Sequence, residues 1–293
     1  MNLLTDVDRG RNYLNFKFCP YVYSMKFELR NEPYGHYKLK GYRKMLYDLA
    51  QQLPANFIGK KLGLVLRKIV LQNKLRVVDA DPIGFRLRFY PLDNLGDRFM
   101  LFLPQFYEKT EFELIEQMLK ADSVFVDIGA NAGVYSLVAA KKITSAGKII
   151  AIEPNPLMVE RFKTNLRFNN KEDLVDIIES GVADKAGEFE LAIDAKNMGS
   201  SSIINDYGGE KIKIKCYPLL ELIENRTGKI DILKIDVEGA DALVMNAFLS
   251  TAPKHLFPRY IMIETPENLD VESFGYQIRI KLEQNTIYEL KTQ

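Results

Sequence analysis

The stretch VFVDIGANAGVYSL, residues 124–137, decides the fold of this chain. It consists of a short apolar strand that reaches Asp127, a turn that contains Gly129, Asn131 and Gly133, and the apolar start of a helix. Glycine permits a sharp turn or the close approach of a ligand, and a helix start presents free N–H groups to an anion. In an open α/β sheet, such a joint lies at the crevice beyond the carboxyl end of the first strand. The segment therefore predicts a cofactor-binding loop, with an ordinary strand–turn–helix joint as the alternative.

The turn differs from the dinucleotide-binding fingerprint, because position 131 is Asn where G-x-G-x-x-G requires its second glycine. The next strand, within KIIAIEPN at residues 148–155, ends in Glu153, which by subtraction lies 26 residues after Asp127. An acidic residue at this strand tip hydrogen-bonds ribose hydroxyls in α/β nucleotide-binding folds. We therefore expect Glu153 to bind a ribose rather than to be a plain surface carboxylate.

The composition of the 293-residue chain favours a cytoplasmic enzyme. An apolar content of 47% supplies a substantial core, and a net charge of +1 gives no basis for nucleic acid as an electrostatic partner. Cys19 and Cys216 are too few for a disulfide framework and lie in no metal-binding spacing. Asp6 and Asp8 near the start, without an apolar segment, lead us to expect no secretory signal. No apolar run reaches the length of a membrane span.

The sequence divides near residue 76 into an N-terminal extension, residues 1–76, and a larger domain, residues 77–293. The extension is rich in aromatic residues and lysine, and it predicts helices at residues 42–53 and 57–73. In the second of these helices, an apolar face that includes Ile58 opposes a basic face. Such a helix either lies on the inner face of an anionic membrane or, more commonly, packs on its own domain and leaves its lysines in solvent. A homodimer contact through the extension is a further alternative.

The larger domain is expected to begin with a lead-in, residues 85–120, before a core at residues 121–293. The lead-in predicts two short strands around a turn, at residues 85–103, followed by a helix from residue 107. In the core we expect further elements in this order: a helix at 157–168, a third strand that ends at Asp184, and strands at 188–194 and 211–217. The polar, glycine-rich segment 197–210 is either a substrate lid or a plain hairpin connection.

The segment DILKIDVEG, residues 231–239, is the second element that carries chemistry. Its apolar residues predict a buried strand, and Lys234, Asp236 and Glu238 then fall on one strand face. Burial of a lysine and two carboxylates requires that they pair or reach a polar cavity, and a purely structural ion-pair network is the alternative. A helix, a buried strand with Glu264 at its tip, and an antiparallel closing pair with Asn285 at or beside its turn complete the chain.

The motifs DIGANAGVYSL, IEPNP, SGVADKAGEFEL, KIDVEG and IMIETPE, in this order, resemble the FkbM-type family of S-adenosylmethionine-dependent methyltransferases. The resemblance covers residues 85–293 and implies a Rossmann-like class I methyltransferase fold of the α/β class, with a seven-stranded, mostly parallel sheet and an antiparallel last strand. It implies O-methylation of a hydroxyl on a sugar, glycan or secondary metabolite. The sequence departs from the family pattern after KIDVEG, where Ala240 and Asp241 replace the usual His or Glu pair.

The resemblance also implies roles for individual residues. The glycine turn with Asp127 would hold the methionine portion of the cofactor, Glu153 its ribose and Asp184 its adenine amino group. The full expected cofactor-binding set is Asp127, Gly129, Ala130, Asn131, Gly133, Tyr135, Glu153, Pro154, Asn155, Gly181, Val182, Ala183, Asp184 and Asp236. The acceptor would contact Glu238, Glu264, Ser200 and Ser201. The product would be S-adenosylhomocysteine.

Methyl transfer from a sulfonium is an in-line displacement, so the protein mainly aligns the acceptor and removes its proton. A sugar hydroxyl is a poor nucleophile, so we expect Asp236 or Glu238 as the general base, with Lys234 orienting it. Mg²⁺ held by two carboxylates is a conceivable addition but is not expected. The alternatives are a methyltransferase that acts on protein or nucleic acid, an NAD-dependent oxidoreductase, and a non-catalytic scaffold with the same fold.

Overall fold

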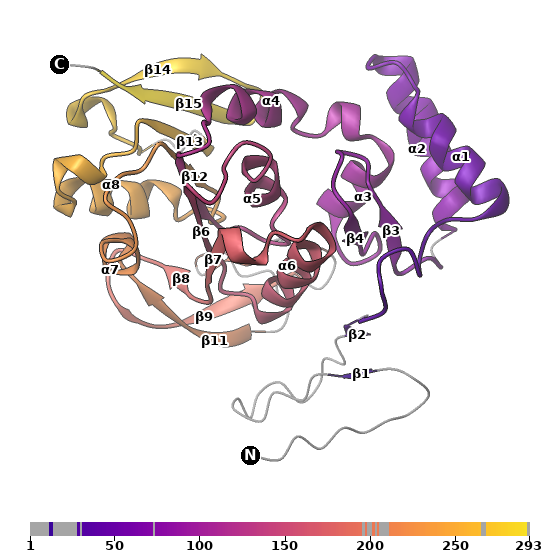
Figure 1. Cartoon of the computed structure of the whole chain (residues 1–293), viewed down its shortest axis with the longest axis horizontal. Coiled ribbons are helices and arrows are strands. Elements are labelled where there is room, and N and C mark those ends of the chain that lie inside the picture. The colour runs from indigo at the N-terminus through magenta and orange to yellow at the C-terminus, as the bar shows by residue number, and fades with distance from the viewer. Residues whose placement is uncertain are drawn as a thin grey trace.

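The computed structural model describes residues 12–13, 28–29, 31–72, 74–194, 197, 201–202, 204, 211–264 and 268–291 (Figure 1). Its α-helices are α1 (Gly41–Gln51), α2 (Phe57–Leu71), α3 (Leu95–Phe102), α4 (Lys109–Met118), α5 (Val134–Ala139), α6 (Pro156–Asn169), α7 (Leu219–Ile223) and α8 (Asp241–Thr251). The strands of the central sheet are β5 (Val124–Ile128), β6 (Lys148–Ile152), β7 (Val175–Ile178), β12 (Ile232–Ile235), β13 (Tyr260–Glu264), β14 (Tyr276–Lys281) and β15 (Asn285–Leu290). The remaining strands are β1 (Asn12–Tyr13), β2 (Glu28–Leu29), β3 (Val78–Ala80), β4 (Leu87–Phe89), β8 (Gly181–Val182), β9 (Gly187–Ile193), β10 (Ser201–Ser202) and β11 (Lys211–Tyr217).

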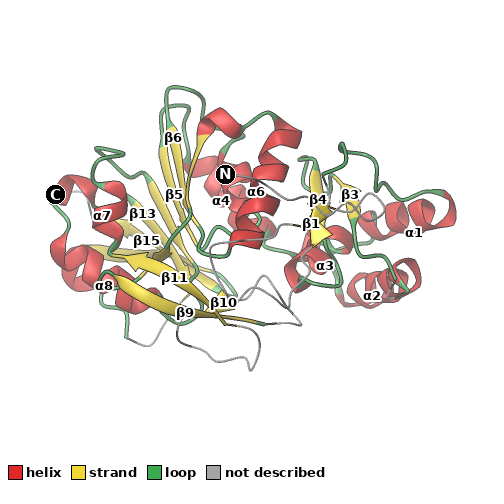
Figure 2. Cartoon of the chain, turned by 90° about the horizontal axis from the view of Figure 1, so that it is seen from below, coloured by secondary structure: helices red, strands yellow, loops and turns green. Residues whose placement is uncertain are grey.

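The central sheet has seven strands in the order β14-β15-β13-β12-β5-β6-β7. The five strands from β13 to β7 run parallel, and β15 is antiparallel to both of its neighbours. Side chains alternate between the faces of β5: Phe125 packs in the cluster that contains α4, α5 and α6, and Val126 packs in the cluster that contains α7 and α8. The expected class I methyltransferase fold is therefore confirmed (Figures 1 and 2).

The expected third strand, which was to end at Asp184, is in fact two strands that belong to different sheets. β7 ends at Ile178 in the central sheet, and β8 pairs with β11 in a smaller sheet of order β10-β9-β11-β8. The chain turns at Ser180, whose backbone N–H donates to the Ile178 carbonyl at 3.0 Å. An apolar run interrupted by a single polar pair gives no sign of such a change of sheet.

The second strand expected at residues 85–103 is a helix, α3, and its position matters for the site. The Asn94 side chain caps this helix by accepting a hydrogen bond from the Asp97 backbone N–H at 3.2 Å. The remaining predicted strand, β4, pairs with β3, for which no strand was predicted. The misassignment has a simple cause, because a short apolar run such as FMLFL does not distinguish a strand from a buried helix.

The strand expected at residues 231–239 ends early, at Ile235. Glu238 and Gly239 adopt φ values of +51° and +98°, so Lys234, Asp236 and Glu238 do not share one strand face as predicted. The carboxylate of Asp241 bends the chain here, because it accepts hydrogen bonds from the backbone N–H groups of Val237 (3.0 Å) and Gly239 (3.2 Å). The residue that departs from the family pattern therefore shapes the turn between β12 and α8.

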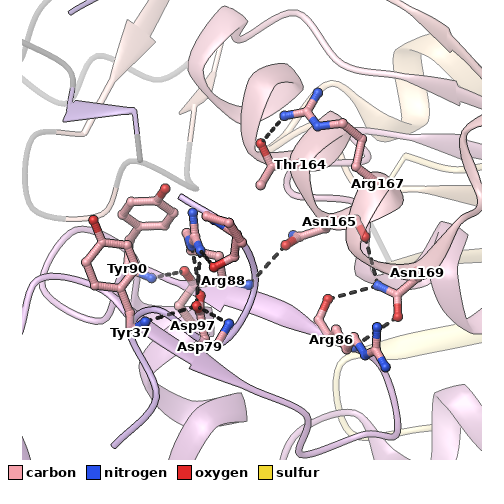
Figure 3. Close-up of polar contacts among 12 residues, drawn as sticks. Tyr37, Asp79, Arg86, Arg88, Tyr90, Asp97, Thr164, Asn165, Arg167 and Asn169 are labelled. Carbon is pink, nitrogen blue, oxygen red and sulfur yellow. Dashed lines mark hydrogen bonds and ion pairs between the residues drawn. The ribbon is translucent and has the colours of Figure 1, made fainter. Parts of the chain in front are cut away.

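The extension contains helices as predicted. Its second helix, α2, does not pack in the way considered more common, with its apolar face on the domain, because that face is exposed. α2 packs on the domain through the buried Gly63 and Val70, while the apolar side chain of Ile58 is exposed. Neighbouring residues of the extension join a polar network at β3 and β4 (Figure 3). In the part of the chain that the structure describes, no helix is both long enough and apolar enough to span a bilayer.

Candidate functional site

A cavity of about 360 Å³ opens beyond the carboxyl ends of β5, β6 and β12, at the position expected for an open α/β sheet. Its volume lies within the range of small-molecule sites. The cavity walls come from the glycine turn, the tips of β6 and β12, β8, and the start of α3. The expected site residues that line it are Gly129, Ala130, Asn131, Tyr135, Glu153, Pro154, Gly181, Val182, Lys234, Asp236 and Glu238.

The glycine turn has the backbone conformation that the sequence predicts. Gly129, Asn131 and Gly133 have φ values of +74°, +51° and +82°. A Cβ atom at Gly129 would overlap the backbone carbonyl of Asp236, and one at Gly133 would overlap the Phe162 ring. Both glycines are therefore required by the backbone and by close packing.

The amide groups of residues 129–132 donate hydrogen bonds within the protein, whereas the expectation of N–H groups that face an anion concerns the helix start that follows them. Gly129 and Ala130 donate to the Ile152 carbonyl at 3.0 and 3.1 Å. Asn131 donates its backbone N–H to Glu153 Oε2 at 2.8 Å, and the next amide donates to the Asn131 side chain. The turn is therefore fixed in shape by internal hydrogen bonds, and side chains such as those of Glu153, Lys234 and Asp236 provide polar groups of the cavity wall.

Glu153 is a buried carboxylate at the tip of β6, with 6% of its surface exposed. Besides the bond from Asn131, its Oε1 accepts the backbone N–H of Asn155 at 2.8 Å. Burial raises the pKa of Glu153 to about 7, against the lowering effect of these two N–H groups. Each oxygen retains a free lone pair, so the group can accept hydrogen bonds from a diol in the cavity.

Asp127 and Lys234 form a buried pair on neighbouring strands, β5 and β12. Asp127 is fully buried below the cavity and does not line it; its Oδ2 accepts a hydrogen bond from Ser136 Oγ at 2.7 Å. Lys234 Nζ lies 3.8 Å from Asp127 Oδ1 and 3.4 Å from Asp236 Oδ2, and 4.8 Å above the Tyr135 ring. Burial acts to lower the pKa of Lys234, but Asp236, Asp127 and Glu108 together raise it, so the ammonium stays charged.

Asp236 lies at the rim, where 46% of its side chain is exposed and Lys234 holds one of its oxygens. Glu238 follows in the turn before α8, partly buried, and lines the same wall. Its backbone carbonyl accepts a hydrogen bond from Ser202 Oγ at 2.9 Å, which ties β10 to this turn. Lys234 therefore reaches one base candidate, Asp236, directly.

Sequence reasoning missed Glu108, which enters the cavity from the residue that precedes α4. Glu108 has a φ of +46°, and its Oε2 is buried without a hydrogen bond from any described residue. Burial raises its pKa to about 7, opposed by the charge of Lys234 and a hydrogen bond with Tyr135. The sequence offered one weak sign, an acidic residue in the first turn of the helix predicted from residue 107, which is ordinarily a simple charge at a helix start.

Other lining residues also come from the lead-in and the closing hairpin. They are Asn94, Gly96, Asp97, Met100, Tyr107 and Gln284. The first four belong to α3 and its cap, the segment for which a strand was predicted, so they were not expected near the site. Burial raises the pKa of Asp97 to about 6, although Asp97 Oδ2 accepts the Tyr90 backbone N–H at 2.7 Å.

Several expected site residues lie outside the cavity lining. Asp184 and Glu264 are exposed, whereas Gly133, Asn155 and Ala183 lie behind the wall. The pKa of Glu264 is raised by burial and by Asp236, so Glu264 stands near the same rim. Ser201, in β10, pairs with Ile193 of β9, and Ser200 lies outside the described residues. Among the residues that the structure describes, no group of three His, Cys, Asp or Glu side chains is placed to hold a metal ion.

The known proteins that this chain resembles are methyltransferases. Residues 127–284, more than half of the chain, match the family model of the methyltransferase FkbM domain. Methyltransferase sdnD of Sordaria araneosa is 24% identical over 211 residues, which cover 60% of this chain and 77% of that protein. Ribosomal RNA large subunit methyltransferase E of Rhodopseudomonas palustris (strain HaA2) is 30% identical over 152 residues, which cover 48% of this chain and 61% of that protein.

A solved structure of methyltransferase FkbM from Methylobacillus flagellatus KT has 14% sequence identity and a TM-score of 0.42. The matched region covers 83% of this chain and 57% of that one, so this chain spans little more than half of the solved protein.

Proposed function

Because the chain belongs to the methyltransferase FkbM domain family and is an S-adenosylmethionine-dependent methyltransferase, we propose that its acceptor is a hydroxyl group on a sugar, a glycan or a secondary metabolite. The observation that carries this proposal is the position of Asp236 at the cavity rim, 3.4 Å from the buried Lys234 ammonium. A hydroxyl acceptor needs a base, and an exposed carboxylate held in place by a buried lysine meets that need.

The residues present fit S-adenosylmethionine. The cofactor is a cation with a ribose diol, and Glu108 Oε2 is a buried acceptor that no described residue satisfies. We propose that Glu153 accepts the ribose hydroxyls and that Glu108 balances positive charge on the methionine portion. Apolar wall residues such as Val182 and Leu191 would contact the adenine. When bound, the cofactor supplies an already activated methyl group.

Asp236 is proposed to take the proton of the acceptor hydroxyl. Lys234 is proposed to position Asp236 by holding one of its carboxylate oxygens at 3.4 Å. Asp127 in turn fixes the ammonium of Lys234 from below. Glu238 and Glu264 lie at or near the rim, where they are proposed to bind further hydroxyls of the acceptor. Catalysis by this chain then consists of alignment and proton removal.

The test combines a binding assay with an acceptor screen. Isothermal titration with S-adenosylhomocysteine, with NAD as the control, measures cofactor recognition without any acceptor. Transfer of a radiolabelled methyl group to hydroxylated saccharides, polyketide-like metabolites, ribosomal RNA and protein then identifies the acceptor class. Saccharide or metabolite labelling that Asp236→Asn abolishes, and that the exposed Asp122→Asn leaves intact, supports the proposal. Labelling of RNA or protein alone would overturn it and leave the methyltransferase assignment standing.

A further inference from the structure

The helical hairpin of α1 and α2 carries most of the exposed large apolar side chains of the molecule. Among the described residues, twelve such side chains are exposed, and eight of them lie on these two helices. The eight are Tyr42, Met45, Leu49, Phe57, Ile58, Leu62, Val65 and Ile69. Single exposed apolar residues are normal, but a concentration on one element marks an interaction surface. Figures 1 and 2 show the hairpin at the end of the molecule away from α7 and α8.

On α2 these residues form one continuous stripe. Ile58, Leu62, Val65 and Ile69 follow the spacing i, i+4, i+7 and i+11, which places them in line along a helix. Their exposed fractions are 66%, 49%, 56% and 43%. On α1, Tyr42, Met45 and Leu49 repeat the pattern at i, i+3 and i+7.

The domain does not need this stripe for its own packing, because another face of α2 makes that contact. Gly63 is buried so closely against Leu103 that a Cβ atom would overlap the leucine side chain. Gly59 is packed equally closely against the carbonyl of Pro54, which lies in the loop between α1 and α2. The small residues therefore face the protein, and the large aliphatic residues point outward.

Charge distinguishes among possible occupants of this face. Residues 41–71 contain six lysines and arginines and one acidic residue, Asp48, although the whole chain has a net charge of only +1. Asp48 is neutralised by Lys44 at 2.6 Å, whereas Lys60, Lys61 and Lys68 are exposed. At 100° per residue, Lys61 and Lys68 lie directly beside the apolar stripe of α2. Their aliphatic stems can lie on an apolar phase while their ammonium groups reach phosphates.

We infer that the α1–α2 hairpin binds the anionic surface of a lipid bilayer, with the stripe inserted and the lysines at the phosphate level. An aliphatic stripe flanked by lysines is the pattern of an interfacial helix. A second copy of this chain is disfavoured, because symmetric pairing would bring two strongly cationic faces together. Binding would be peripheral, since no described helix can span the bilayer. α2 packs on α3, whose first residues line the cavity, so the contact would also orient the cavity relative to the membrane.

The test is cosedimentation of the full chain with vesicles of phosphatidylcholine alone or with one third phosphatidylglycerol. We expect binding to the anionic vesicles only, weakened by added salt. Replacement of Ile58, Leu62, Val65 and Ile69 by Gln should weaken partitioning roughly a hundredfold or more. Leu243→Gln with Ile278→Gln, which removes exposed apolar side chains elsewhere, is the matched control and should bind like the parent protein.

Charge is tested separately. Lys60→Gln, Lys61→Gln and Lys68→Gln together should lower binding to anionic vesicles roughly tenfold or more, whereas three exposed lysines of β11 changed in the same way should have little effect. Titration with S-adenosylhomocysteine confirms that each variant is folded. Equal binding of the parent protein and the stripe variant would overturn the inference, as would a dimer in sedimentation velocity that the stripe variant dissolves. The inference does not depend on the acceptor, so it can fail independently of the proposed function.

Discussion

Replacement of Lys234 by methionine tests whether the buried pair beneath the cavity is both structural and functional. The methionine side chain has similar length and no charge, and it leaves Asp127 fully buried without its cationic partner, with hydrogen bonds from the hydroxyl and the backbone N–H of Ser136. For Nζ and Oδ1 at 3.8 Å, Coulomb's law with an effective dielectric constant of about 20 gives about 4 kcal/mol. This agrees with the loss of about 3–5 kcal/mol that follows removal of one partner from a buried pair.

The pH dependence of this loss has a definite sign. Burial already raises the pKa of Asp127, and removal of Lys234 must raise it further. The folded variant then binds a proton that the unfolded chain, with a carboxyl pKa of about 3.9, has released. Stability of the variant therefore falls as pH rises above about 4, until the raised pKa is passed. It falls relative to the parent protein once the pH exceeds the parent's own raised pKa of Asp127. Urea unfolding at pH 5 and pH 8 measures the difference.

Asp127→Asn in the Lys234→Met background supplies the control. Asparagine accepts the Ser136 hydrogen bond without a charge, so the double variant should recover at least about 1–2 kcal/mol at pH 8. Equal stability of parent and Lys234→Met, or a double variant no more stable than the single one, would refute the reasoning. Turnover should fall in both the single and the double variant, because Asp236 loses the group that positions it.

Four further outcomes follow from the site. Asp236→Asn should lower kcat by about 10²–10⁴-fold while the Kd for S-adenosylhomocysteine stays unchanged, since the residue acts on the acceptor; unchanged kcat would exclude it as the base. Affinity for S-adenosylhomocysteine should fall at least about tenfold from pH 8 to pH 6 as Glu108 and Glu153, each with a pKa of about 7, are protonated. Glu108→Gln should bind more weakly and show a smaller pH dependence, and an unaltered titration profile would contradict its role. Gly133→Ala should lower the free energy of unfolding by about 2–4 kcal/mol, because its φ is +82° and the methyl would meet the Phe162 ring; differential scanning calorimetry measures this. EDTA should leave the methyl transfer rate unchanged, and a loss restored by Mg²⁺ would show that a metal takes part.

The sheet and the tip of β6 could be predicted from sequence because their signals are local. Strand, glycine turn and helix follow one another within residues 124–137, and Glu153 marks the next strand tip by its position alone. α3 could not be predicted, because its apolar run fits a strand as well as a helix and its cap is a single asparagine. The sequence also could not show that the amides of the glycine turn donate hydrogen bonds within the protein. These bonds depend on the approach of the Ile152 carbonyl and the Glu153 carboxylate from a neighbouring strand.

The other features that could not be predicted concern residues whose roles depend on contacts that only the fold creates. Glu108 is an ordinary acidic residue in the sequence, and only the fold places it beside Lys234. The alternation of Lys234, Asp236 and Glu238 led us to expect that these side chains pair or reach a polar cavity. All three line the cavity, and Lys234 pairs with Asp236, although the strand ends at Ile235. A period of two predicts a shared face only while the backbone stays extended, and Asp241 ends that extension.

The buried Arg88 joins three parts of the chain that are distant in sequence (Figure 3). Its guanidinium pairs with Asp79, which also accepts the backbone N–H groups of Gly35 and Tyr37 from the extension. The Arg88 backbone N–H donates to Asn165, whose amide donates to the Ala132 carbonyl inside the glycine turn. The change in composition near residue 76 therefore does not separate two parts that move or unfold independently. Loosening of the extension would reach the turn at the cavity through three side chains, those of Asp79, Arg88 and Asn165, and we expect both parts to melt in one cooperative transition.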